Sequence, residues 1–118
     1  MNKKILIIED EESFLSILKK VFGSEGFEVL TAKDGEHGLE AAEREKPDLI
    51  ISDMLMPRMD GLSMANKLRE LKISAPIFFL TNVSDQERDT KHFDYFVKSD
   101  TNIDELVKKA KEKLGILK

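Results

Sequence analysis

The sequence predicts an α/β fold in which one parallel sheet of five strands carries helices on both faces. Three observations support this fold class. Short aliphatic runs alternate with segments of helical periodicity, no repeat or linker interrupts them, and a length of 118 residues suits one domain, which we take as residues 1–118. Alternating strands and helices form parallel pairs through right-handed crossovers. We therefore expect a doubly wound sheet in a single domain.

The first strand is predicted at Ile5–Ile8, a continuous aliphatic run of the kind that a parallel sheet buries on both faces. Four consecutive acids end this run. Apolar residues then recur with the spacing of an amphipathic helix, which Gly23 and Gly26 should close. This apolar stripe consists of Phe14, Ile17, Leu18, Val21 and Phe22.

A second strand and a second helix follow. Phe27–Thr31 is a short run of strand-forming residues. Asp34 is suited to cap the N-terminus of a helix because its carboxylate can accept a backbone hydrogen bond. We expect this helix to run to about Glu45, since Pro47 cannot continue it.

The third strand leads directly into a loop. Leu49–Ile51 is again a buried aliphatic run, and it ends at Ser52 and Asp53. The segment Met54–Gly61 contains a proline and an Asp-Gly pair, which are typical of loops. A third helix is predicted from Leu62 onward.

The last two strands are separated by a polar stretch. Ile77–Leu80 and Tyr95–Val97 read as strands four and five, and the stretch Asn82–Asp94 offers few apolar anchors for an amphipathic helix. The final helix carries one apolar face. Its members are Ile103, Leu106, Val107, Ala110 and Leu114.

Composition and charge exclude several classes of function. The net charge is −4, and basic residues are scattered among acids, so direct nucleic-acid binding is not expected. No segment is long and apolar enough for a signal peptide or a membrane span, and we expect no membrane association. The chain has no cysteine, which excludes disulfides and thiolate sites and suits a reducing cytosol. We therefore expect a cytoplasmic protein.

Polar side chains follow four of the predicted strands. Glu9 and Asp10 come after the first strand, Asp53 after the third, Thr81 after the fourth and Lys98 after the fifth. Taken alone, each of these residues more often lies in a turn, caps a helix or belongs to the exposed first turn of a helix. Ligands of doubly wound sheets bind beyond the carboxyl ends of the strands, and all five residues fall at that edge. The sequence therefore predicts a functional site there.

The residue types at this edge indicate phosphoryl chemistry with a divalent cation. Clustered carboxylates repel one another unless a cation neutralises them, and Mg²⁺ prefers one or two carboxylates plus a phosphate oxygen, which suits Asp10 and Asp53. A carboxylate can also act as a nucleophile and form an aspartyl phosphate. A lysine ammonium and a threonine hydroxyl could then hold the phosphoryl oxygens.

Four segments of the chain resemble the receiver domain of two-component response regulators, the CheY-like superfamily. These segments are ILIIEDEE, DLIISDMLMPRMDGL, FFLT and YFVK. The resemblance runs through the whole chain, and it implies the flavodoxin-like strand order 2-1-3-4-5. It also implies a signalling module that promotes only its own phosphorylation and dephosphorylation and is otherwise not an enzyme.

The resemblance assigns a role to each polar residue of the sheet edge. Asp53 would accept the phosphoryl group from a sensor histidine kinase or a phosphotransfer protein. Mg²⁺ or Mn²⁺ would be held by Asp10, Asp53 and the backbone carbonyl of Leu55, with Glu9 acting largely through metal-bound water.

The same resemblance implies a conformational switch. Thr81 and Lys98 would bind the phosphoryl oxygens, and the rotamer of Tyr95 would follow the position of Thr81. The changed surface would be read by a downstream protein target or by an effector domain absent from this chain. The alternative for Tyr95 is an edge-strand aromatic whose hydroxyl faces water.

Two departures from the family pattern lead to structural expectations. The family usually has a proline after its lysine, joined by a cis bond, but Ser99 follows Lys98 here. Since a cis bond without proline costs about 3 to 4 kcal/mol, we predict a trans bond. The interval between Thr81 and Lys98 is also shorter than usual by roughly one helical turn. We therefore expect a shortened or missing fourth helix.

The sequence leaves three other functions open. A pseudo-receiver would keep the fold and bind partners without phosphorylation. The missing proline and the short fourth segment mildly favour it, and the intact set of Asp10, Asp53, Thr81 and Lys98 argues against it. A haloacid-dehalogenase phosphohydrolase would resemble a D-x-D motif on the first strand, which the triplet Glu9-Asp10-Glu11 lacks. A flavodoxin would need amides and hydroxyls around the flavin phosphate, where this chain has acids.

Overall fold

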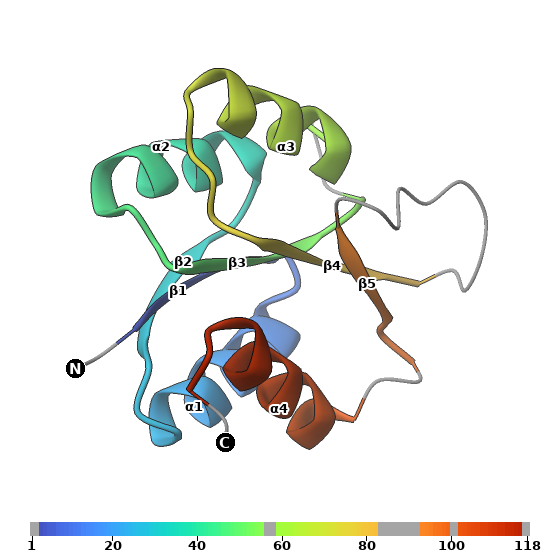
Figure 1. Ribbon diagram of the computed structural model, residues 1–118. Helices are drawn as coiled ribbons and strands as arrows, with labels where there is room; N and C mark the ends of the chain where they lie inside the picture. The colour runs from blue at the N-terminus through green and yellow to red at the C-terminus, as the bar shows by residue number, and fades with distance from the viewer. Residues whose placement is uncertain (1–2, 56–58, 83–92, 100–101, 117–118) are drawn as a thin grey trace.

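The computed structural model describes residues 3–55, 59–82, 93–99 and 102–116, and its strands form one five-stranded parallel sheet in the order β2-β1-β3-β4-β5 (Figure 1). This confirms the predicted fold class and strand order. The elements are β1 (Lys4–Ile8), α1 (Glu12–Ser24), β2 (Glu28–Ala32), α2 (Gly35–Glu45), β3 (Leu49–Asp53), α3 (Gly61–Glu70), β4 (Ile77–Thr81), β5 (Asp94–Val97) and α4 (Ile103–Lys113).

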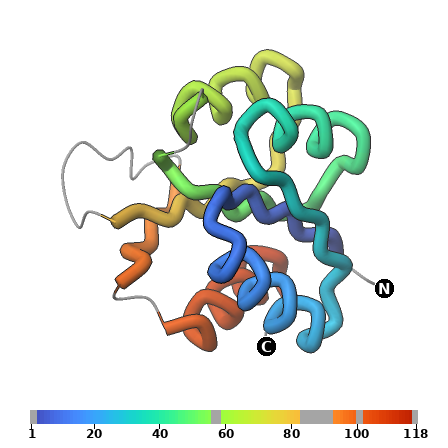
Figure 2. Tube along the Cα trace, turned by 180° about the vertical axis from the view of Figure 1, so that it is seen from behind, coloured from blue at the N-terminus to red at the C-terminus, as the bar shows by residue number. Residues whose placement is uncertain are grey.

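The helices form two layers around the sheet. Helices α2 and α3 cover one face, and α1 and α4 lie side by side on the other (Figures 1 and 2). Because successive side chains of a strand point to opposite faces, each face has its own apolar core. Phe78 and Leu80 belong to the core under α1 and α4, whereas Ile77 and Phe79 belong to the core under α2 and α3. The central strand β3 is buried along its full length.

The strand register aligns the carboxyl ends of four strands at one edge. Residues at or next to the carboxyl ends of neighbouring strands pair with one another. These pairs are Ile8 with Ser52, Asp53 with Leu80, and Thr81 with Val97. Parallel pairing has a fixed direction, so any residue just after these positions emerges at the same edge. The polar residues singled out in the sequence therefore converge there.

Local structure agrees with most of the element predictions, with boundaries shifted by one or two residues. The Asp34 carboxylate accepts a hydrogen bond from the His37 amide at 2.8 Å, which confirms the predicted cap of α2. No peptide bond among the described residues is cis, which confirms the trans Lys98–Ser99 bond. The predicted shortening or loss of the fourth helix falls on residues 83–92, which lie outside the described residues.

Gly61 closes the loop that follows Asp53. Its amide donates a hydrogen bond to the Met54 carbonyl at 2.8 Å, and Asp60 caps α3 through the Ser63 amide at 2.8 Å. A Cβ atom at position 61 would lie 2.6 Å from Cε1 of Phe79 and 3.1 Å from Cα of Met54. Only glycine fits this contact without displacing the loop.

A Gly61→Ala variant should therefore be less stable by about 1 to 3 kcal/mol, the usual cost of forcing an extra carbon into a packed interior. Urea denaturation followed by circular dichroism measures this. Gly23→Ala is the matched control, because a Cβ at position 23 meets no atom within 4 Å. The control should be neutral or more stable by up to about 1 kcal/mol, since alanine favours the helix. Equal stability of Gly61→Ala and the unsubstituted chain would contradict the packing argument.

Candidate functional site

Three carboxylates meet at the carboxyl edge of β1 and β3. Glu9 and Asp10 follow β1, Asp53 ends β3, and one oxygen of each lies within 4.8 Å of the others. Glu9 is 1% exposed and Asp53 is 6% exposed, whereas Asp10 is open to solvent. The Glu9 side chain is held in place because its Oε2 accepts a hydrogen bond from the Glu11 amide at 3.0 Å. Two buried acids and one exposed acid thus share one small volume.

Lys98 supplies a positive charge to this acidic cluster. Its Nζ lies 2.9 Å from Oε1 of Glu9 and 3.2 Å from Oδ2 of Asp53. The Lys98 side chain is only 13% exposed, so these contacts are shielded from water. The Lys98 amide donates to the Thr81 carbonyl at 2.7 Å, which extends the β4–β5 pairing by one residue and sets the start of the side chain.

Burial and charge shift two pKa values in this cluster. Burial raises the pKa of Glu9 above its ordinary value, and the nearby Asp53 charge adds to the shift, while Lys98 and the Glu11 amide oppose it. Burial lowers the pKa of Lys98, but its contacts with Glu9 and Asp53 outweigh burial, and the net pKa is raised. The two carboxyl groups thus favour the charged form of Lys98, and this one ammonium lies among three acidic side chains.

The donor set fits a hard divalent cation. Oxygen ligands alone, from carboxylates on adjacent strand ends, are what Mg²⁺ and Mn²⁺ prefer. Oε1 of Glu9 is buried and contacts Lys98 as an ion pair, but none of the described residues gives it a well-aligned hydrogen bond. The Lys98 ammonium already compensates this oxygen, and the three carboxylates that lie within 4.8 Å of one another supply the oxygen ligands of a cation site. The residues Glu9, Asp10 and Asp53 can thus hold a metal ion.

The structure also places the other three predicted site residues, Thr81, Leu55 and Tyr95. Thr81 ends β4 and is 3% exposed, one residue beyond the Leu80 that pairs with Asp53. The Leu55 amide donates to Oδ1 of Asp53 at 3.4 Å, and its side chain is 68% exposed. Tyr95 is half-buried on β5, with its ring stacked on Phe79 at 5.6 Å between centroids. Tyr95 thus packs on the face of the sheet that α2 and α3 cover.

One contact of the site was missed by the sequence interpretation. The Phe14 ring, on α1, lies under the Lys98 ammonium with 5.0 Å between Nζ and the ring centroid. The sequence placed Phe14 only in the apolar stripe of that helix. Nothing in the periodicity distinguishes a residue that packs on the core from one that also reaches a lysine.

Comparison with known proteins identifies the family. The family described as "Response regulator receiver domain" matches residues 5–111, which include all seven site residues predicted from the sequence. The chain belongs to this family. The resemblance seen in four short segments is thereby confirmed, and the protein is a receiver domain of the kind found in two-component and phosphorelay signalling.

Three relatives show how closely this receiver domain matches known proteins. It is 46% identical over 89 residues to the alkaline phosphatase synthesis transcriptional regulatory protein PhoP of Bacillus subtilis, covering 75% of this chain and 37% of PhoP. It is 32% identical over 81 residues to sporulation initiation phosphotransferase F of the same organism, covering 69% of this chain and 65% of that protein. The Francisella response regulator 1452 receiver domain superposes with a TM-score of 0.89 at 27% identity, covering 97% of this chain and 98% of that one.

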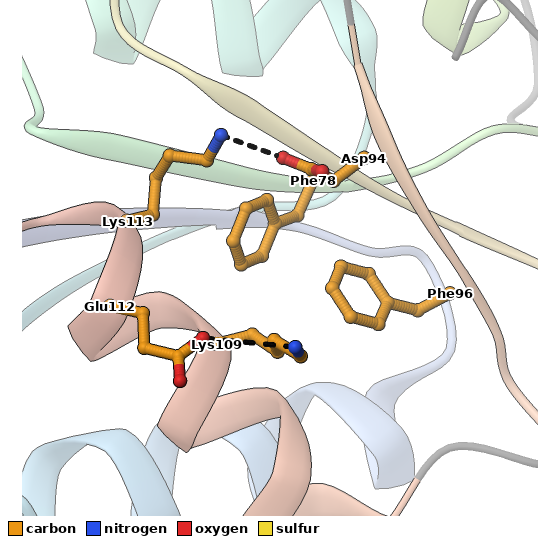
Figure 3. A pocket seen from close by; sticks show the side chains of 6 residues that line it. All are labelled: Phe78, Asp94, Phe96, Lys109, Glu112 and Lys113. Carbon is orange, nitrogen blue, oxygen red and sulfur yellow. Dashed lines mark ion pairs between the residues drawn. The ribbon is translucent and has the colours of Figure 1, made fainter.

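The receiver domain has a further hollow between β4, β5 and α4. It is lined by two aromatic rings, Phe78 and Phe96, and by charged side chains of β5 and α4 (Figure 3). An ion pair of 3.0 Å joins Lys113 to Asp94, the first residue of β5. Lys109 pairs with Glu112 at 3.7 Å, and no residue of the carboxylate cluster lines the hollow, so the hollow is separate from the candidate site. Among the described residues, no helix has the length and apolar character that a bilayer span requires.

Proposed function

We propose that residues 1–118 form one receiver domain that accepts a phosphoryl group on Asp53 from the phosphohistidine of a sensor kinase or phosphotransfer protein. One observation carries this proposal. Asp53 is buried at the carboxyl end of the central strand β3, with two more carboxylates within 4.8 Å and the Lys98 ammonium at 3.2 Å. A nucleophilic carboxylate, a cation site and a fixed positive charge are the groups that phosphoryl transfer to an acid requires.

In this proposal Asp10, Asp53 and the backbone carbonyl of Leu55 would hold Mg²⁺ or Mn²⁺, with Glu9 acting largely through metal-bound water. When bound, the cation neutralises charge between the carboxylates and the incoming phosphoryl oxygens. The fit of the donor set supports this assignment. Lys98 would release its contact with Glu9 and donate to a phosphoryl oxygen.

The transfer step needs the phosphohistidine, the Asp53 carboxylate and one proton from the solvent. A carboxylate oxygen of Asp53 attacks phosphorus, an O–P bond forms, and the N–P bond of the phosphohistidine breaks. The histidine nitrogen keeps the electron pair and takes a proton from water. The Lys98 ammonium and the Thr81 hydroxyl hold the oxygens of the transferred group. Thr81 and Tyr95 lie on the neighbouring strands β4 and β5, and in this proposal the rotamer of Tyr95 follows the position of Thr81.

Output would pass to a downstream protein target or to an effector domain outside this chain. The chain spans about a third of the transcriptional regulatory relative PhoP, and the names of such relatives support a regulatory output. A cytoplasmic location is part of the proposal, since kinase and target would meet there.

Phosphoryl uptake tests the proposed function directly. The chain is incubated with Mg²⁺ and either acetyl phosphate or a phosphorylated histidine kinase. Intact mass should increase by one phosphoryl group, and hydroxylamine should remove it because an acyl phosphate is labile to this nucleophile. A chain that takes up no phosphoryl group from any donor would be a pseudo-receiver, and the proposal would be wrong.

Removing the exposed carboxylate of the cluster should weaken metal binding. An Asp10→Asn variant loses one unit charge beside the cation, so its dissociation constant for Mg²⁺ should rise by about 10- to 1000-fold. Isothermal titration calorimetry measures this constant. Glu12→Gln is the matched control, because Glu12 is an exposed acid of α1 that lies outside the cluster. A similar weakening in both variants would mean that general charge, and not ligation by Asp10, controls binding.

A further inference from the structure

Lys98 has a third neighbour besides its two carboxylates. Its Nζ lies over the Phe14 ring at 5.0 Å from the centroid, on the side of the sheet that carries α1 and α4. Phe14 is half-buried and packs against the core of that face. These core contacts restrict the ring on the side away from the ammonium.

The face of an aromatic ring attracts a cation through its quadrupole, and the attraction grows when water is excluded. The Lys98 side chain is only 13% exposed, so this condition is met. The ring differs from Glu9 and Asp53 in one respect: it cannot ligate a metal ion or accept a phosphoryl group. Its attraction for the ammonium therefore persists when the carboxylates are engaged elsewhere.

We propose that Phe14 is a positioning residue, which holds the Lys98 ammonium in place while Asp53 is phosphorylated. The inference rests on the proposed function, because Lys98 is the group through which Phe14 acts. Without the ring, the flexible lysine stem would sample several positions once Glu9 and Asp53 no longer hold it. Replacing Phe14 should then slow the phosphorylation of Asp53 without weakening Mg²⁺ binding.

A Phe14→Leu variant tests this, because leucine keeps the apolar bulk and removes the ring. With acetyl phosphate as donor and saturating Mg²⁺, its maximal rate constant for phosphorylation should fall by about 2- to 30-fold, the range that a desolvated cation–π contact allows. The Mg²⁺ dissociation constant should stay unchanged. Phe14→Tyr keeps the ring and should restore the rate.

A double-mutant cycle with Lys98→Met separates positioning from general packing. If Phe14 acts through Lys98, adding Phe14→Leu to Lys98→Met should cause no further loss of rate. Phe22→Leu is the matched packing control, since Phe22 is a fully buried ring of the same helix and core. It should lower the unfolding temperature and leave the rate constant of the folded protein unchanged.

Nuclear magnetic resonance tests the contact between Phe14 and Lys98 without any phosphorylation. The Hε protons of Lys98 should show upfield ring-current shifts in nuclear magnetic resonance spectra, and these shifts should vanish in Phe14→Leu. An unshifted Lys98 in the unsubstituted chain would overturn the inference while leaving the proposed function intact.

Two results of the rate measurements would also overturn the inference. A Phe14→Leu variant that is slow only with a protein donor would make Phe14 a partner contact. A loss of equal size in the Lys98→Met background would make its role one of packing. If the unsubstituted chain takes up no phosphoryl group, the proposed function fails, and the inference fails with it.

Discussion

An Asp53→Asn variant is expected to take up no phosphoryl group from acetyl phosphate or from a phosphorylated kinase. Asparagine keeps the shape of the side chain but has no anionic oxygen to attack phosphorus, so uptake should fall by about 1000-fold or more. Intact mass spectrometry and phosphate-affinity electrophoresis measure the phosphorylated fraction. The size of the effect follows from the loss of the anionic carboxylate, since the amide oxygen of asparagine is a poor nucleophile.

The controls for Asp53→Asn concern folding and charge. Removing one of three clustered carboxylates relieves repulsion, so the variant should unfold at a temperature no lower than that of the unsubstituted chain. Asp94→Asn makes the same chemical change at the first residue of β5, where it removes only a half-exposed ion pair with Lys113. That variant should be phosphorylated normally. Full uptake by Asp53→Asn would show that another residue is the acceptor.

A Lys98→Met variant is expected to be both slower and less stable. Loss of one fixed positive group at the reacting oxygens should reduce the rate of Asp53 phosphorylation by about 100- to 1000-fold. In the absence of metal, Glu9 and Asp53 would lose the cation that contacts them, which should cost on the order of 1 to 3 kcal/mol of unfolding free energy. Mg²⁺ should restore part of this stability, because a divalent ion neutralises the same carboxylates.

Urea denaturation with and without Mg²⁺ measures the stability effect of Lys98→Met. Lys109→Met is the matched control, since the ion pair of Lys109 with Glu112 is 3.7 Å long and about half exposed on both sides. Its removal should change stability by less than about 1 kcal/mol, with no dependence on Mg²⁺. If Lys98→Met is as stable as the unsubstituted chain in metal-free buffer, Lys98 does not balance the buried acids.

The sequence predicted most of the elements because their signals are local. A run such as Ile5–Ile8 and a cap such as Asp34 act over a few neighbouring residues, and the structure places β1 and the start of α2 there. The order of the strands in the sheet could not be predicted from local signals. Alternating strands and helices fit several orders of the sheet, and the family resemblance was needed to choose 2-1-3-4-5, which the structure confirmed.

The sequence likewise predicted one part of the site, and the tertiary structure decided the other. That Glu9, Asp10, Asp53, Thr81 and Lys98 share one edge follows from the sequence, because parallel strands point their carboxyl ends in one direction. The ion pairs of Lys98 with Glu9 and Asp53, and its contact with Phe14, were decided only by the tertiary structure. Periodicity fixes the face on which a side chain lies. The partner on that face depends on how α1 packs against the sheet and on which rotamers this packing leaves, and both are set by the folded chain as a whole.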